Sequence, residues 1–178
     1  HKHLPFLLKL LAAERALSIQ VHPTKAQAEA GFAAEDAAGI PRNAFERNYK
    51  DDNHKPELLV ALGEFEAMAG FRPVARTREL LDWLALPELD FLRDDLHAAV
   101  ERALHLPDEE VSAVLDALTR RCRELVTTAD GWMGDVADLV LRLEEQYPAD
   151  RGVLFALLLN RVELQAGEAL YLDAGQLH

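Results

Sequence analysis

The apolar residues in the middle of the chain recur at the spacing of α-helices. From residue 77 to Leu143, leucines and valines return every three or four positions, which is the period of one helix face. Pro87 and Pro107 divide this run into separate helices, because proline cannot continue a helix interior. The sequence therefore predicts an all-helical unit over residues 74–150, and we expect any β structure to come from the two ends of the chain.

Within the helical unit, the apolar positions predict where each helix lies. One uninterrupted helix is expected to carry Leu89, Leu92, Leu96, Val100 and Leu104. Asp108 is expected to be the N-cap of the following helix, with Glu109 and Glu110 in its first turn. Cys122 falls within that helix pattern with no histidine near it, so we interpret it as a structural residue rather than a nucleophile.

Short apolar runs bounded by turn residues predict strands on both sides of the helical unit. A buried strand is expected at residues 58–61, and further strands at 17–21, 160–164 and 169–172. A short helix is expected over Thr24–Ala30. The apolar run Val153–Leu159 fits a buried strand and a buried helix equally well. The predicted fold class is α+β, divided into the segments 1–73, 74–150 and 151–178.

The composition argues against several classes of partner. The formal net charge is −12, which argues against binding a nucleic-acid backbone. No uninterrupted apolar run is long enough for a membrane-spanning helix, and a single cysteine favours a cytoplasmic protein. All the lysines lie within the first 55 residues. A site for an anionic small molecule is therefore expected there rather than in the acidic helical unit.

Four residues of the β segments are candidate ligands for one metal ion. In an extended chain, Gln20 and His22 lie two positions apart and project to the same side. Glu57 offers a carboxylate, and a predicted strand and glycine turn lead to His178 at the last position. Together these side chains form a mixed nitrogen and oxygen ligand set. The alternative is that Gln20 and Glu57 only make hydrogen bonds within the β structure.

Several motifs occur in the order in which one enzyme family has them. They are Leu4–Lys9, Leu17–Pro23, Asn48–Glu57, Ala69–Pro73, Leu157–Asn160 and Gly167–Ala169. The runs Ser-Ile-Gln-Val-His-Pro and Asn-His-Lys-Pro-Glu are the most specific parts. These motifs closely resemble type I mannose-6-phosphate isomerase. The resemblance implies a cupin-type β jelly roll, here partial, with an inserted all-helical domain.

The resemblance also implies what the candidate ligands bind. Gln20, His22, Glu57 and His178 each fall on a position where the family binds zinc, and the segment from Gly167 onward fits the second cupin motif. Such an oxygen-rich ligand set would also accept manganese, cobalt or iron. The expected cofactor is therefore one divalent ion, with zinc as the first choice.

In this family, the reaction interconverts mannose 6-phosphate and fructose 6-phosphate through an enediol, so the implied activity is that of an aldose–ketose isomerase in mannose metabolism. By resemblance, Lys55 binds the substrate and stabilises transition-state charge, while Ser18 and Lys9 contact the phosphate. A surface lysine is the alternative for Lys55. His54 is expected to orient a metal ligand, with a direct catalytic role as the alternative.

Family members continue beyond the part that matches this chain, and the arginine regarded as catalytic lies in that continuation. No catalytic base is therefore assigned here. An incomplete jelly roll leaves open strand edges, so we expect poor stability or self-association through those edges. Two other functions remain open at this point: a non-catalytic or truncated cupin that binds a sugar phosphate, and an acidic helical interaction module formed by Val74–Asp150 alone.

Overall fold

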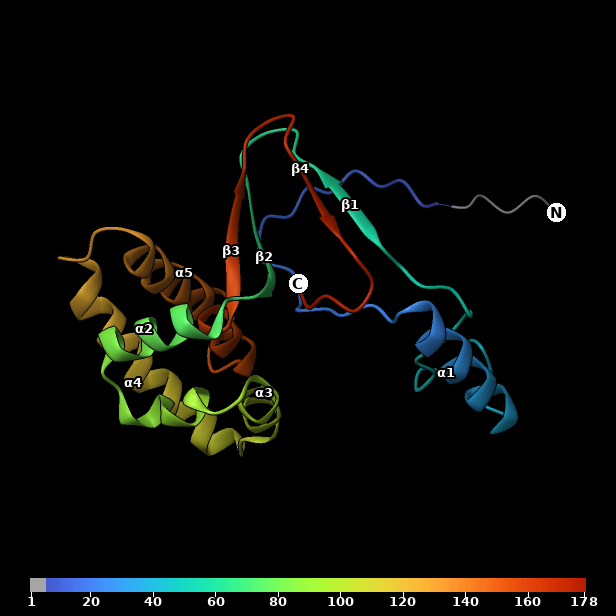
Figure 1. Ribbon diagram of the computed structural model, residues 1–178, viewed down its shortest axis with the longest axis horizontal. Coiled ribbons are helices and arrows are strands. Elements are labelled where there is room, and N and C mark those ends of the chain that lie inside the picture. The colour runs from blue at the N-terminus through green and yellow to red at the C-terminus, as the bar shows by residue number, and fades with distance from the viewer. Residues whose placement is uncertain (1–5) are drawn as a thin grey trace.

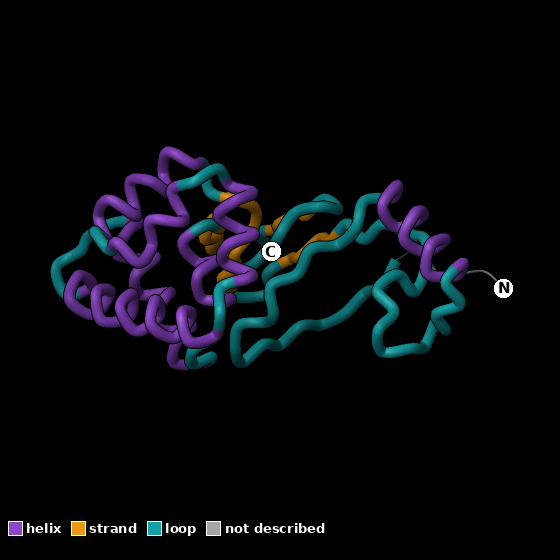
Figure 2. The backbone as a smooth tube through the Cα atoms, turned by 90° about the horizontal axis from the view of Figure 1, so that it is seen from below, coloured by secondary structure: helices purple, strands orange, loops and turns teal. Residues whose placement is uncertain are grey.

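The computed structural model describes residues 6–178, so the beginning of the predicted Leu4–Lys9 motif lies outside the described residues. Helices gather at one end of the molecule, helix α1 lies at the opposite end, and four strands lie between them (Figures 1 and 2). This arrangement confirms the predicted α+β class. Within residues 6–178, no helix is both long and apolar enough to cross a membrane.

The helical lobe, residues 74–157, follows the helical spacing in the sequence. Its elements are α2 (Val74–Leu84), the 3₁₀ helix η1 (Pro87–Arg93), α3 (Leu96–His105), α4 (Asp108–Val126), α5 (Trp132–Gln146) and the 3₁₀ helix η2 (Arg151–Leu157). Their apolar faces meet in one core that includes Leu80, Leu118 and Leu154, each 0% exposed. Cys122 lies in this core, and burial raises the pKa of its thiol to about 12.

Two details of the predicted helices are wrong. The expected single helix from Leu89 to Leu104 is interrupted, because the side chain of Asp95 accepts hydrogen bonds from the backbone N–H groups of His97 and Ala98 and starts α3 afresh. Asp108 is not an N-cap, since Pro107 holds that position and Asp108 is the first helical residue. Its carboxylate instead accepts a hydrogen bond from the guanidinium of Arg151.

The strands form two antiparallel pairs. Strand β1 (Glu57–Val60) pairs with β4 (Ala169–Leu172), and β2 (Phe65–Phe71) pairs with β3 (Leu159–Leu164). Strand β4 has the predicted bounds, whereas the expected burial of β1 is wrong because Leu58 is 66% exposed and Val60 52% exposed. The run left open at Val153–Leu159 combines both alternatives, since η2 ends at Leu157 and β3 begins at Leu159.

Helix α1 (Lys25–Ala37) confirms the predicted helix after Thr24 but extends seven residues beyond Ala30. Thr24 and Gln27 form a capping box at its start, which satisfies otherwise unpaired backbone donors. Residues 17–21 are extended but are not part of a regular strand. Instead, this segment pairs through its backbone with the end of the chain, where Gln20 and His178 exchange two hydrogen bonds of 2.6 and 2.9 Å.

Candidate metal centre

Three side chains from distant parts of the sequence converge at one place. The Nε2 atom of His22 lies 3.1 Å from Oε1 of Glu57, and Nε2 of His178 lies 3.4 Å from Oε2 of the same carboxylate. The two imidazole rings are 5.5 Å apart between centroids. One donor atom from each residue lies within 4.8 Å of the other two. The group is therefore a two-histidine, one-carboxylate cluster.

Strand pairing positions Glu57. It is the first residue of β1 and lies opposite Leu172, the last residue of β4. Alternation along β1 sends the side chains of Leu58 and Val60 to the other face of the pair. The carboxylate therefore lies beside the turn through which the chain continues from β4 to His178. Gly175 has φ +89° in this turn, a conformation that favours glycine.

Backbone hydrogen bonds on both sides hold the last two residues of the chain. His178 pairs with Gln20, and the N–H of Gly70 in β2 donates to the carbonyl of Leu177 at 2.8 Å. Gly70 lies in an irregular part of β2 and has φ +65°. The amide of Asn160 donates to three consecutive carbonyls there, those of residues 69–71, at 3.1–3.2 Å. Asn160 thereby fixes the bulge that presents Gly70 to Leu177.

The pairing with His178 also determines where Gln20 lies. Residues that exchange both hydrogen bonds in an antiparallel pair stand directly opposite and project their side chains to the same face. Gln20 is therefore on the His178 side of its segment, and His22 follows two positions later. The N–H of Gly175 donates to the carbonyl of His22 at 2.7 Å and extends the pairing. Gln20 as a fourth ligand stays a prediction.

The chemistry of the donor set fits a cation. The Nδ1 atom of His178 lies 3.0 Å from the carbonyl oxygen of Gln176, so we assign the proton to Nδ1. Its Nε2 lone pair then faces a carboxylate oxygen, and two such acceptors need a proton or a cation between them. The 3.1 and 3.4 Å separations match the edge of about 3.3 Å for a tetrahedral ion with zinc-type bond lengths.

The structure places the other predicted site residues less closely. Lys55 and His54 are exposed and precede Glu57 in an irregular segment. Ser18 and Lys9 are exposed in the extended segment before α1, Ser18 four residues before His22. Among the described residues, no hydrogen bond or ion pair joins these side chains to the cluster, so their roles in substrate binding stay predictions.

The loop that leads to Glu57 is anchored on α1. Glu35 accepts hydrogen bonds from the backbone N–H groups of Asn48 and Tyr49 at 3.0 and 2.8 Å, and the bond from Asn48 lowers the pKa of this carboxyl group. Lys25 donates to the carbonyl of Asp52 at 2.6 Å. Asp51 accepts from the N–H of Asn53 at 2.9 Å and so closes a turn in this loop. These contacts set the approach of the chain to β1.

Sequence reasoning missed two residues that shape the cluster. Gln176 supplies the carbonyl that orients the ring of His178, and Asn160 fixes the bulge beside Leu177. A backbone carbonyl carries no sequence signal. Asn160 was expected as the start of a strand and as the end of the Leu157–Asn160 motif, and neither role indicates that its side chain reaches across to β2.

The fold and the cluster define a class: a metal-binding, cupin-type β structure with an inserted helical lobe. Comparison with models of protein families identifies the family within this class. The family model for the catalytic domain of type I phosphomannose isomerase matches residues 1–74, and the model for the helical insertion domain of the same family matches residues 86–159. Together they cover most of the chain, which therefore belongs to the type I phosphomannose isomerase family.

Individual relatives agree with this assignment. The mannose-6-phosphate isomerase of Escherichia coli is 42% identical over 184 residues, and that of Bos taurus is 35% identical over 196 residues. Each alignment covers 98% of this chain but only 45% and 43% of the respective relative. The chain thus spans less than half the length of these curated relatives.

Solved structures show the same relationship. A point mutant of phosphomannose isomerase from Salmonella typhimurium matches with a TM-score of 0.82 at 38% identity, over 94% of this chain and 43% of that one. A structure of mannose 6-phosphate isomerase from the same organism, bound to substrate (f6p) and zinc, matches with a TM-score of 0.68 at 35% identity and the same coverage. These matches confirm the partial cupin fold with its helical insertion.

Proposed function

We propose that this chain is part of a metal-dependent aldose–ketose isomerase that interconverts mannose 6-phosphate and fructose 6-phosphate through an enediol. The observation that carries the proposal is the cluster of His22, Glu57 and His178 within a member of this family. The substrate and zinc named for the Salmonella typhimurium enzyme support the choice of reaction and metal. A sugar phosphate is accordingly the proposed partner, and neither nucleic acid nor a membrane is needed.

Four residues would hold the ion. His22 and His178 would supply nitrogen, Glu57 a carboxylate oxygen and Gln20 an amide oxygen, a set that suits zinc and also accepts manganese, cobalt or iron. When bound, the ion supplies positive charge that stabilises an oxyanion next to the carbon that loses its proton. The carbonyl of Gln176 keeps the proton of His178 on Nδ1, so that the lone pair of Nε2 is available to bind the ion.

Lysine and hydroxyl groups of the N-terminal segment would bind the substrate. Lys55 lies two residues before Glu57, and its ammonium group would donate to the oxygen that gains charge as the proton moves between C1 and C2. Ser18 and Lys9 would contact the phosphate through a hydroxyl and an ammonium group. His54 would orient one of the metal ligands through a hydrogen bond and would not bind the ion itself.

Three further properties belong to the proposal. The chain divides into a cupin part at residues 1–73, a helical insertion at 74–150 and returning strands at 151–178. A cytoplasmic location agrees with a buried free thiol at Cys122. The chain would self-associate through the open edges of its two-stranded sheets, for example at the β1–β4 pair, where the directly paired Leu58 and Tyr171 are 66% and 60% exposed. Sedimentation tests that last property, since a stable monomer at high concentration would contradict it.

The reaction is tested with a coupled assay for fructose 6-phosphate formation, on the 178-residue chain and on the full-length protein. We expect chelation to abolish turnover and added zinc to restore it. Lys55→Ala should lower kcat/KM about a hundredfold, because it removes a charge from the reacting oxygen, whereas the nearby exposed Lys50→Ala should not. Binding of mannose 6-phosphate without turnover, in the full-length protein, would favour the non-catalytic sugar-phosphate cupin.

A further inference from the structure

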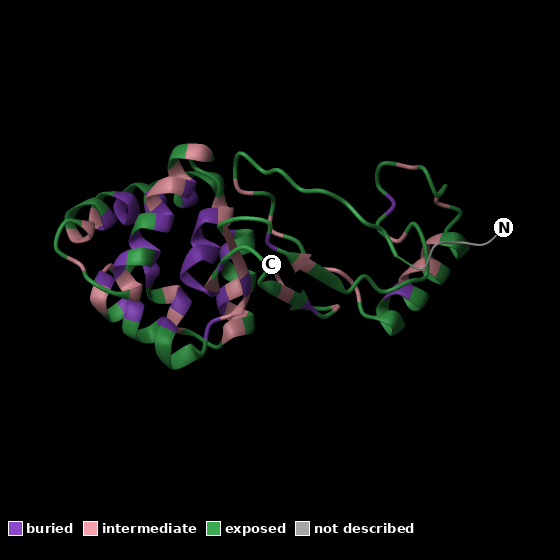
Figure 3. Ribbon diagram, turned by 90° about the horizontal axis from the view of Figure 1, so that it is seen from above, coloured by how far each residue is buried: buried purple, intermediate pink, exposed green. Residues whose placement is uncertain are grey.

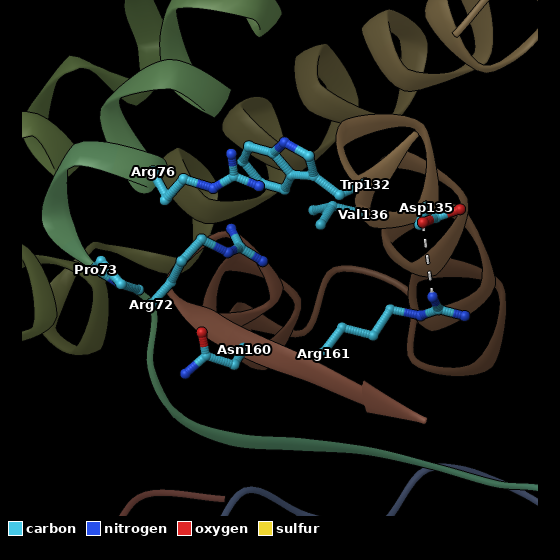
Figure 4. A pocket seen from close by; sticks show the side chains of 8 residues that line it. All are labelled: Arg72, Pro73, Arg76, Trp132, Asp135, Val136, Asn160 and Arg161. Atoms are coloured by element: carbon cyan, nitrogen blue, oxygen red, sulfur yellow. Dashed lines mark ion pairs between the residues drawn. The ribbon is translucent and has the colours of Figure 1, made fainter. Parts of the chain in front are cut away.

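A polar cavity lies where the helical lobe meets the β2–β3 pair (Figure 4). Its volume is about 300 Å³, and its walls come from the start of α2, the first turns of α5 and the start of β3. None of the three clustered metal-site residues lines it. Three of the lining side chains are arginines and one is an aspartate. The wall is therefore mainly cationic in a chain whose net charge is −12.

Arg72 is the most buried of these arginines, with 7% of its surface exposed. Its guanidinium donates to the carbonyls of Leu157 and Leu159 at 2.8 Å and to that of Ala156 at 3.3 Å, at the end of η2. The carbonyl ends of a helix attract positive charge. Three bonds leave two of the five N–H donors of this group for another acceptor. Among the described residues, no carboxylate pairs with Arg72.

Arg76 brings a second positive charge to the same place. Its guanidinium carbon lies 4.1 Å from the ring centroid of Trp132, and that of Arg72 lies 5.2 Å from the same centroid. Figure 4 shows both guanidinium groups beside this ring. Burial and the charge of Arg76 lower the pKa of Arg72 to about 10. Among residues 6–178, only the carboxylate of Glu79 lies within 4.0 Å of the guanidinium of Arg76, in an exposed contact of 3.4 Å that contributes little.

The third arginine is already neutralised. Arg161 donates to Glu66 and to Glu163, and its Nη1 lies 3.9 Å from Asp135. Its ion pairs with Glu66 and Asp135 therefore link β3 to β2 and to α5. The uncompensated charge of the cavity belongs to Arg72 and Arg76, two like charges that repel each other and share one open space.

We propose that this cavity binds a small phosphate-type oxyanion between the guanidinium groups of Arg72 and Arg76, beside Trp132. A tetrahedral oxyanion accepts several hydrogen bonds at once from such planar donor groups and relieves the repulsion between them. The volume of about 300 Å³ is at the small end for ligand sites, which fits inorganic phosphate or a phosphate on a short organic carrier. This site is independent of the isomerase proposal, since neither the proposed metal ligands nor Lys55, Ser18 and Lys9 line the cavity.

Tryptophan fluorescence can report the binding. The chain has two tryptophans, so Trp83→Phe leaves Trp132 as the single reporter. This variant is titrated with inorganic phosphate, with glycerol 3-phosphate and with sodium chloride at equal ionic strength, all in the presence of a chelator that keeps metal from the other site. The same titrations follow in the added Arg76→Gln variant and in a matched Arg120→Gln variant. Arg120 is exposed on α4 and does not line the cavity.

We expect a saturable change with phosphate that chloride does not reproduce. Arg76→Gln should raise the half-saturating concentration about tenfold, because it removes a charge-assisted bond, and Arg120→Gln should leave it unchanged. Binding of glycerol 3-phosphate as well would show that the site takes a carried phosphate, and binding of inorganic phosphate alone would restrict it to the free ion. Arg72 is left intact because its bonds to η2 hold the fold.

The absence of a saturable phosphate signal would overturn the proposal, and so would equal effects of Arg76→Gln and Arg120→Gln. Circular dichroism and calorimetric titration with phosphate accompany each variant. A loss of signal in Arg76→Gln therefore counts only when the helices are retained and heat of binding is lost as well.

Discussion

The helical lobe and the β region of this chain differ in how their structure is maintained. Buried side chains gather in the lobe, whereas β1, β4 and α1 are largely exposed and β2 and β3 are half-buried (Figure 3). The core cluster runs from Leu80 to Leu159 and includes no residue of β1 or β4. The candidate metal ligands all lie in the exposed region. Packing therefore stabilises one region, and the chemistry is placed on the other.

The β region depends on hydrogen bonds and ion pairs instead. Backbone bonds join Gln20 to His178 and Gly70 to Leu177. A bidentate ion pair, at 2.8 and 2.9 Å, links Arg142 of α5 to Glu66 of β2 and ties the sheet to the lobe. Such directional contacts fix positions accurately but bury little apolar surface. The difference implies that the ligands can be changed without unfolding the lobe, and the predictions below test this separation.

The largest effect is expected on metal affinity. Glu57→Ala should weaken zinc binding by about a thousandfold, since it removes the only carboxylate of the cluster. The same change should leave the unfolding of the helical lobe within about 0.5 kcal/mol, because Glu57 is exposed and outside the core. Competition with a chromophoric chelator and urea unfolding measure the two quantities. Glu64→Ala, which removes an exposed carboxylate a few residues away, is the control and should change neither.

A leucine in each region gives the next largest contrast. Leu118→Ala in α4 should lower the free energy of unfolding by about 3 kcal/mol, because the side chain is 0% exposed and its loss leaves a cavity. Leu58→Ala in β1, where the side chain is 66% exposed, should change it by less than about 0.5 kcal/mol. Urea unfolding followed by helical circular dichroism measures both. Equal losses would mean that β1 shares the core of the lobe.

Asn160 lies at the border of the two regions, directly after the core residue Leu159, and its substitution should have an intermediate effect. Asn160→Leu removes three bonds to the bulge in β2 and should cost about 2 kcal/mol, because carbonyl groups lose their partner. Zinc affinity should also fall about tenfold, since the bulge holds Leu177 beside His178. Asn43→Leu, at an exposed position in the loop after α1, serves as the control. Unchanged affinity in a folded Asn160→Leu variant would contradict the positioning role.

The smallest effect concerns pH. The guanidinium of Arg142, followed by that of Arg161, holds the pKa of Glu66 below its ordinary value of 4.5. The ion pair therefore adds stability above pH 4.5, and this stability is lost as the pH falls through the lower pKa of the folded state. Glu66→Gln should remove this dependence, so that the two proteins differ at pH 7 and converge in acid. Urea midpoints measured from pH 7 to pH 3 test this, and parallel curves would contradict it.

Most helices and strands whose bounds depend on local periodicity or on turn residues could be predicted from the sequence. Strand β4 has its expected bounds, and α1 begins where Thr24 and Gln27 form a capping box. The break between η1 and α3 was missed, because a helical apolar spacing continues across it and only the local hydrogen bonds of Asp95 reveal the new start. The exposure of Leu58 was also missed, since an apolar run does not say which face is covered.

In the candidate site, too, some features could be predicted from local sequence and others could not. His22, Glu57 and His178 could be proposed from motif and spacing, because extended segments and a glycine turn bring such residues together. The bulge at Gly70 and the carbonyl of Gln176 arise from contacts between distant segments, so no local pattern indicates them. The same holds for the cavity beside Arg72 and Arg76, which forms only where the start of α5 brings Trp132 against these two arginines. Local sequence predicts the metal ligands, and contacts between distant segments determine how these ligands are positioned.

The central claim is that residues remote in the sequence bind one divalent ion at this cluster. X-ray absorption at the zinc edge of the zinc-loaded chain, with one equivalent of metal, tests it most directly. The account predicts one ion per chain with two imidazole ligands and oxygen donors completing the set, and the loss of one imidazole in His22→Ala. A zinc spectrum without imidazole, or one that His22→Ala and His178→Ala leave unchanged, would contradict it.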